Sequence, residues 1–153
     1  MPKKKGIIYW LLILLTISSL VYSTTFQQYK FFKLENNIGL TDAKSYIEMS
    51  RNNYKTADQI HRYRFIIPKA VSLLRENNII SNLSKFNRGK ESKEDKVTIF
   101  LFYIVNLIFT ISSAFILFLF LEKVGLKSIG AAIGTVIYIT SRVTIISTGA
   151  PLV

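Results

Sequence analysis

The segment Val97–Leu121, VTIFLFYIVNLIFTISSAFILFLFL, decides the fold of this chain of 153 residues. It is mostly Ile, Leu, Phe and Val, and it is longer than the roughly 20 apolar residues that cross a hydrocarbon core of about 30 Å. Its polar positions are expected to face other helices: Asn106, Thr110, Ser112 and Ser113. The segment therefore predicts a transmembrane helix over residues 97–121.

A second apolar segment follows after a short hydrophilic turn. Residues 122–128 form this turn, and residues 129–148 are long and apolar enough for another transmembrane helix. Gly130 and Gly134 make a small-xxx-small pair, which lets a second helix approach closely. That helix partner belongs either to another protein or, more commonly for a lone pattern, to the same chain.

Arg142 is the one charged residue within residues 129–148. It lies six residues before Thr148, so its side chain either snorkels outward to the membrane surface or binds a phosphate group. Residues 149–153, GAPLV, break the helix and are expected on the external side, at an end that we expect to be truncated.

Residues 1–26 are expected to form a basic N-terminus followed by the first transmembrane helix. Lys3, Lys4 and Lys5 precede the apolar run, and aromatic residues lie near its ends as interfacial anchors (Tyr9, Trp10 and Tyr22). A cleaved signal peptide is the alternative interpretation. The Tyr9–Trp10 pair and the two further apolar segments favour the uncleaved helix.

Charge and composition exclude several classes of function. The net charge is +11, but the basic residues are interrupted by the apolar segments and lie in no recognisable nucleic-acid motif, so no nucleic-acid partner is expected. The chain has no cysteine and one histidine, which excludes a disulfide framework and disfavours a transition-metal site. No cofactor is indicated, and the need for a divalent cation is left open.

Residues 27–96 form a loop of 70 residues between the first two apolar segments. Fourteen basic and eight acidic residues give this loop a charge of +6. We predict helices over 42–52 and 65–78, and a solvated charged linker over 85–96.

The two predicted loop helices each carry an apolar face. In the first helix, four residues at spacings of three and four share a face: Ala43, Tyr46, Ile47 and Ser50. In the second, the predicted stripe comprises Phe65, Ile66, Ala70, Leu73 and Leu74. The second helix is expected either to lie along the lipid headgroups or to pack on the rest of the loop.

The distribution of basic residues predicts the topology. Three lysines precede the first segment, and Lys123 and Lys127 lie in the turn 122–128, which places both sites in the cytoplasm. The loop 27–96 is then external, although its basic far end fits this orientation poorly. We expect an all-α, multi-pass protein of the plasma (inner) membrane with three transmembrane helices, a cytoplasmic N-terminus and the lipid bilayer as its partner.

Asp42 and two arginines are the candidate functional residues of the loop. Thr41 or Asp42 is a natural helix N-cap, and Asp42 is alternatively a general base that accepts a proton from an acceptor hydroxyl. Arg62 and Arg64, beside His61, either bind a phosphate or form a basic collar on the headgroups.

Two short motifs in the loop resemble those of GT-C membrane glycosyltransferases and their uncharacterised relatives. They are G-x-x-D-A-x-S-Y over Gly39–Tyr46 and Y-R-F-x-x-P over Tyr63–Pro68, and the ending Gly149–Val153 is similar as well. The motifs are short and degenerate. GT-C folds contain many more spans than three, so the resemblance implies an N-terminal portion that is not expected to be catalytic alone.

The resemblance implies a sugar donor linked to polyprenyl phosphate. It would make Asp42 the general base or an acid that positions the acceptor. Tyr46, Arg62, Arg64 and Arg142 would then be substrate-binding residues, with Arg64 near the donor phosphate or at the structural base of the loop. A small, non-catalytic, multi-pass membrane interaction protein is the alternative function.

Overall fold

The computed structural model describes residues 6–32, 41–55, 65–75 and 92–149, and every regular element in these ranges is an α-helix. The helices are α1 (Ile7–Phe31), α2 (Thr41–Ser50), α3 (Ile66–Arg75), α4 (Lys93–Lys123), α5 (Ser128–Thr140) and α6 (Arg142–Gly149). By length and composition α1 and α4 can each cross a membrane, and the bent pair α5–α6 can form a third crossing. The prediction of an all-helical membrane protein is confirmed at this level.

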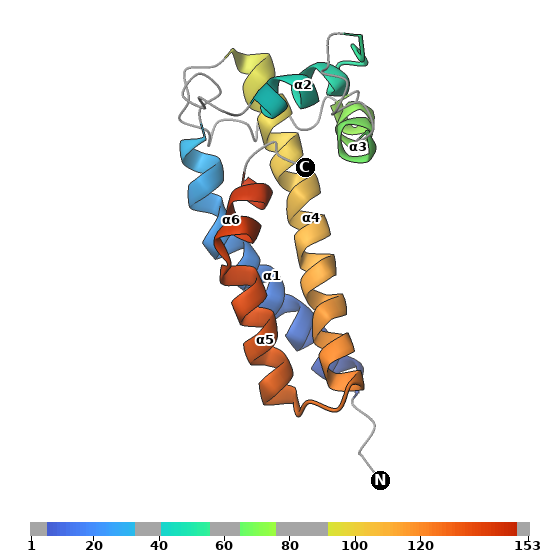
Figure 1. The fold of residues 1–153 in the computed structure, drawn as a ribbon, viewed down its shortest axis with the longest axis vertical. Coiled ribbons are helices and arrows are strands. Elements are labelled where there is room, and N and C mark those ends of the chain that lie inside the picture. Colours follow the sequence, from blue (N-terminus) through green and yellow to red (C-terminus); the bar gives the residue numbers. More distant parts are fainter. Residues whose placement is uncertain (1–5, 33–40, 56–64, 76–91, 150–153) are drawn as a thin grey trace.

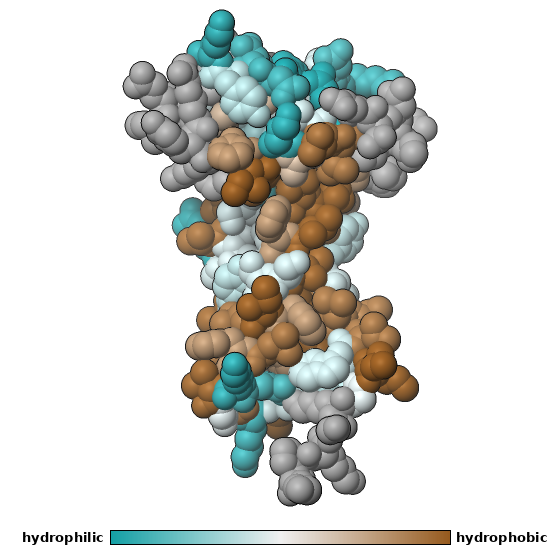
Figure 2. All heavy atoms as spheres, turned by 90° about the vertical axis from the view of Figure 1, so that its right-hand side faces the viewer, coloured by the Kyte–Doolittle hydropathy of each residue, from teal (hydrophilic) through white to brown (hydrophobic). Residues whose placement is uncertain are grey.

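The helices form a shaft with a small cap at one end (Figure 1). In the shaft, α4 contacts both α1 and α5, and α6 packs between α1 and α4. The cap consists of α2, the turn 51–55 and α3, and it contacts α4. In Figure 1 the cap lies at the end of the molecule opposite the N-terminus. Hydrophilic residues gather at the cap end, and hydrophobic residues cover much of the shaft (Figure 2).

Two apolar clusters hold the shaft and the cap together. One cluster lies in the shaft and joins Ile17 and Val21 of α1 to Ala114 and Phe118 of α4. The other joins the ends of α1 and α4 to the cap, with residues from α1, α2, α3 and α4 in one buried group. The cap is therefore part of the protein core rather than a separate surface feature.

The α4 helix begins at Lys93 instead of Val97, because its first turn is capped. The Ser92 hydroxyl accepts a hydrogen bond from the Asp95 backbone N–H at 3.2 Å and lies 2.7 Å from Asp95 Oδ2. Glu94 and Asp95 also place negative charge near the positive end of the helix dipole. The last residues of the predicted charged linker thus belong to α4, and residues 85–91 lie outside the described ranges.

The third apolar segment is divided into two helices that meet at an angle of 56°. Ser141 lies between them in an extended conformation, and its hydroxyl accepts a hydrogen bond from the Thr144 N–H at 3.2 Å. A serine that caps the next helix in this way ends one helix and starts another. The bend at Ser141 therefore has a local chemical cause.

The α3 helix is rotated relative to the predicted stripe. Val71 and Pro68 are buried and Ala70 and Leu74 are partly buried, as expected for the side that meets α2 and α4. However, three predicted stripe residues are exposed: Phe65 at 53%, Ile66 at 65% and Leu73 at 57%. The helix therefore packs on the protein, as one of the two alternatives predicted, and its contact with lipid headgroups stays a prediction.

The α2 helix has the predicted buried face, since Ala43, Tyr46, Ile47 and Ser50 are all at most 2% exposed. It ends in a Schellman motif, in which the Asn53 N–H bonds the Glu48 carbonyl and the Asn52 N–H bonds the Met49 carbonyl, both at 3.0 Å. Asn52 adopts a φ of 61°, a left-handed conformation that asparagine tolerates better than most residues. This turn places Asn52 beside Ser72 of α3.

Candidate functional site

Asp42 lies in the first turn of α2, one turn before Tyr46. Because α2 starts at Thr41, Asp42 is the second helical residue and not its N-cap. A carboxylate in a first turn complements the helix dipole whether or not it has a chemical role. Tyr46 is fully buried in the core cluster at the cap end, so the structure gives it a packing role, and its binding of substrate stays a prediction.

Arg51 joins the end of α2 to the start of α4. One terminal nitrogen donates to Glu48 Oε1 at 3.2 Å, and the other donates to Asp95 Oδ1 at 2.5 Å. The Asn53 amide donates to the second Glu48 oxygen at 3.1 Å. The Arg51 and Asp95 side chains are only 30% and 23% exposed, so water screens this pair less than a pair on an open surface. The contact fixes α2 over the first turn of α4.

Two further polar contacts attach α3. The Ser72 hydroxyl donates to Asn52 Oδ1 at 3.3 Å, and Arg75 donates to Glu94 Oε2 at 3.4 Å. Between these contacts lies an open polar pocket of about 280 Å³, lined by Ser50, Arg51, Asn52, Ser72 and Arg75. We call this the cap pocket. It is formed by the C-terminal turn of α2 and one side of α3.

The other predicted site residues do not lie at the cap pocket. Arg62 and Arg64 fall outside the described ranges, so their roles stay predictions. Arg142 is the first residue of α6, directly after the bend, and its side chain is exposed. It forms no ion pair with any residue that the structure describes. Snorkelling and phosphate binding both stay open for it.

Buried polar contacts fasten α6 to α4 within the shaft. The Asn106 amide donates to the Ser147 carbonyl at 3.0 Å, and the hydroxyls of Thr110 and Thr148 lie 2.7 Å apart. Asn106 and Thr110 therefore face another helix, as predicted. Ser112 and Ser113, for which the same was expected, are exposed instead.

Both glycines of the small-xxx-small pair have neighbours in the same chain. A Cβ added at Gly134 would lie 2.8 Å from Leu121 Cδ1, and one at Gly130 would lie 3.5 Å from Leu126 Cδ2. Leu121 is on α4, so Gly134 lets α4 and α5 approach. Use of the pair by a separate helix partner stays a prediction.

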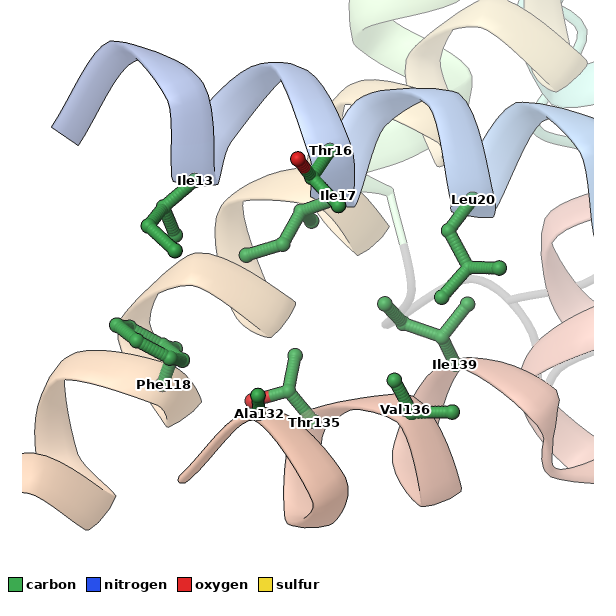
Figure 3. A pocket seen from close by; sticks show the side chains of 9 residues that line it. All are labelled: Ile13, Thr16, Ile17, Leu20, Phe118, Ala132, Thr135, Val136 and Ile139. Carbon is green, nitrogen blue, oxygen red and sulfur yellow. The ribbon is translucent and has the colours of Figure 1, made fainter. Parts of the chain in front are cut away.

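A narrow apolar pocket of about 70 Å³ lies in the shaft, between α1 and α5 (Figure 3). The labelled side chains of Ile13, Leu20 and Ile139 point into this gap in Figure 3. Its two threonines, Thr16 and Thr135, donate to backbone carbonyls of their own helices at 2.8 Å. The remaining wall is hydrocarbon.

The sequence interpretation missed Arg51 and Arg75 as the arginines of a pocket. One signal was available for Arg51, because Glu48 and Arg51 are three apart on a predicted helix and can pair there. The partners of both arginines, Asp95 and Glu94, were assigned to a linker, and this concealed the arrangement. Within the described ranges no three His, Cys, Asp or Glu side chains are grouped to hold a metal ion.

No family model matches this chain, nor does any curated protein or solved structure. The fold by itself defines the class: an all-helical protein with two helices, or three with the bent pair, that can span a membrane.

Proposed function

We propose that the chain is part of a GT-C-like membrane glycosyltransferase that takes sugar from a polyprenyl-phosphate-linked donor. In this proposal Asp42 is the general base or the acid that positions the acceptor. The observation that carries the proposal is that Asp42 lies in the first turn of a helix fastened to the end of α4. The short motifs at Gly39–Tyr46 and Tyr63–Pro68 supply the choice of family.

A general base must be held within hydrogen-bond reach of the proton that it accepts. Three attachments hold α2: the buried Tyr46 ring, the Arg51–Asp95 pair and the Asn52–Ser72 contact. These attachments fix the backbone of α2 relative to the end of the shaft. That rigidity supports a positioned acid more than a mobile loop would.

The proposed donor has an apolar chain and a phosphate. The pocket between α1 and α5 would take part of the hydrocarbon, because its wall is almost entirely apolar. Arg62, Arg64 and Arg142 would bind phosphate, since guanidinium groups match phosphate oxygens well. Arg142 lies seven residues before the end of α6, which corresponds to about 10 Å of helix rise. Its long side chain would extend toward the membrane surface to meet the phosphate.

The proposed orientation places the cap outside the plasma (inner) membrane and the N-terminus in the cytoplasm. Because the chain has no cysteine, a single Ser45→Cys substitution on the partly exposed side of α2 gives a clean label site. We expect a membrane-impermeant maleimide to label intact cells at this position. Lys127→Cys, in the α4–α5 turn, should be labelled only in inverted vesicles. The reverse pattern would place the cap in the cytoplasm.

The proposed function is tested in the native host with the chain expressed from its own gene. Isolated membranes receive a polyprenyl-phosphate-linked sugar, and release of free polyprenyl phosphate is measured by mass spectrometry. We expect Asp42→Asn to lower this release by about 100-fold or more, the usual size of a general-base contribution.

Asp58→Asn makes the same chemical change elsewhere in the loop and serves as the control, with both variants compared at equal amounts in the membrane. Full transfer by Asp42→Asn would remove the role of Asp42. If deleting the gene left transfer unchanged for all the polyprenyl-linked sugars of the host, the enzyme proposal would fail.

The Gly130–Gly134 pair is one of the grounds for the alternative of a non-catalytic interaction protein, beside the short chain and the charged loop. A Cβ at Gly134 would lie 2.8 Å from Leu121 Cδ1 of α4, so this glycine already has an explanation inside the fold. For this reason we take the enzyme proposal as the primary one.

A further inference from the structure

The cap pocket presents hydrogen-bond donors and no carboxylate. Its lining residues carry two guanidinium groups, two hydroxyls and one amide. The Ser50 hydroxyl donates to the Ile47 carbonyl at 2.6 Å and the Ser72 hydroxyl donates to Asn52 Oδ1, so the donors left for a ligand belong to the guanidinium groups and the Asn52 amide. The nearby acids Glu48, Asp95 and Glu94 bond the arginines but do not line the pocket. A ligand that enters from solvent therefore meets neutral polar groups and two guanidinium groups, which are paired with carboxylates outside the lining.

The pocket arginines are held in place differently. Arg51 is fixed by two carboxylates, which use two of its five N–H donors, and its Nε is buried without a hydrogen-bond partner. Arg75 has one contact at 3.4 Å, to a Glu94 side chain that is 75% exposed. An exposed ion pair of this kind is weak, so an anion of higher charge can replace Glu94 at Arg75.

From this lining we propose that the cap pocket binds a phosphate group, with Arg51 and Arg75 as its charged ligands and the Asn52 amide as a neutral donor. Arginine is well suited to this because its planar donors match phosphate oxygens in pairs. The volume of about 280 Å³ lies below the roughly 300–1,000 Å³ of sites for drug-sized ligands, so a single phosphate or small headgroup fits best.

Two sources of phosphate are compatible with the position of the pocket. Free phosphate reaches it from solvent through its open side. A lipid phosphate monoester reaches it from the bilayer, because α3 forms one wall and also exposes Phe65, Ile66 and Leu73. The inference does not depend on the proposed glycosyltransferase activity, and its test contains no transfer reaction.

The test uses the full chain in nanodiscs of phosphatidylcholine and titrates sodium phosphate at constant ionic strength by calorimetry. We expect Arg75→Gln to weaken binding about tenfold or more, the loss of one strong charge-assisted contact. Glu94→Gln removes the competing carboxylate and should tighten binding about threefold. Lys69→Gln makes the same charge change as Arg75→Gln on the exposed side of α3, outside the pocket, and should change binding less than about twofold.

We expect Arg75→Gln to weaken phosphate binding and Glu94→Gln to strengthen it, and this difference distinguishes a binding role from structural loosening. Arg75→Gln and Glu94→Gln break the same ion pair, so a merely structural role would make both variants bind more weakly, and that result overturns the proposal. Equal weakening by Lys69→Gln and Arg75→Gln would also overturn it, because only the general positive charge would then matter.

A second set of nanodiscs contains phosphatidic acid and shows whether the pocket binds free phosphate or a lipid phosphate. If the lipid phosphate occupies the pocket, these discs suppress phosphate binding, and native mass spectrometry shows phosphatidic acid retained by the wild type and lost by Arg75→Gln. Unchanged phosphate binding in these discs identifies free phosphate as the ligand. If phosphate does not bind in phosphatidylcholine discs and phosphatidic acid is not retained, the proposal is wrong.

Discussion

Tyr46→Ala is expected to release the cap from the end of α4. Tyr46 is 0% exposed and lies in the cluster that joins α1, α2, α3 and α4. Truncation of a buried aromatic side chain costs about 3–5 kcal/mol, more than the few polar contacts of the cap can replace. Amide hydrogen exchange in α2 should accelerate by roughly two to three orders of magnitude, if these amides exchange through opening of the cap.

Tyr46→Phe and Lys44→Ala are the matched variants for this experiment. Tyr46→Phe keeps the ring and should retain most of the protection, whereas Lys44 is exposed on the same helix and should have little effect. Wild-type exchange rates in Tyr46→Ala would show that the ring does not hold the cap. Loss of substrate binding with unchanged protection would instead favour the substrate-binding role predicted from the sequence motif.

The parts of the fold that follow from hydropathy and periodicity could be predicted. A long, mostly apolar run such as Val97–Leu121 has few alternatives to a spanning helix, because every backbone polar group must be satisfied inside lipid. The buried face of α2 was predictable for a similar reason, since its apolar residues recur at spacings of three and four. Both features depend on residues close together in the sequence.

The parts that depend on contacts between distant segments could not be predicted. On α3 the buried apolar residues are Pro68 and Val71, whereas Phe65 and Ile66 are exposed. Which side of α3 is buried depends on its packing against α2 and α4. An apolar residue on a short helix near a membrane has two favourable environments, protein and lipid, so periodicity alone cannot assign its side. The cap pocket likewise requires α2, α3 and the first turn of α4 to be brought together.

Local polar chemistry explains the remaining differences. Ser92 and Ser141 each cap a helix, which starts α4 early and divides the third apolar segment. Serine inside an apolar run is equally compatible with a continuous helix, in which its hydroxyl bonds a carbonyl one turn earlier. Only the geometry of the packed chain distinguishes these two states at Ser141.

Gly149→Ala is expected to separate α6 from α1. A Cβ at Gly149 would lie 2.5 Å from Gln28 Cβ, 2.6 Å from Gln28 Cγ and 3.1 Å from the Thr25 carbonyl oxygen. Carbon atoms in favourable contact are about 3.5–4.0 Å apart, so α6 must move by roughly 1 Å. Gln28 Cβ is attached directly to the backbone of α1, and no rotation of its side chain removes the clash.

The same movement strains the polar contacts of α6 with α4. Ser147 and Thr148 immediately precede Gly149, and they bond Asn106 at 3.0 Å and Thr110 at 2.7 Å. Overpacking costs about 1–3 kcal/mol, and hydrogen bonds between membrane helices contribute about 0.6 kcal/mol each. We therefore expect a loss of about 2–4 kcal/mol, measured as a lower midpoint of thermal unfolding in detergent.

Two other glycines of the chain provide a graded control for this prediction. Gly134→Ala meets only the terminal methyl group of Leu121, which can rotate away, and Gly130→Ala finds its nearest side-chain atom at 3.5 Å. Because alanine favours a helix over glycine by up to about 1 kcal/mol, Gly130→Ala should raise the midpoint and Gly134→Ala should change it little. The expected order of stability is therefore Gly130→Ala, Gly134→Ala and, far below both, Gly149→Ala. If Gly149→Ala instead unfolded at the same midpoint as Gly134→Ala, the close contact between α1 and α6 would be wrong.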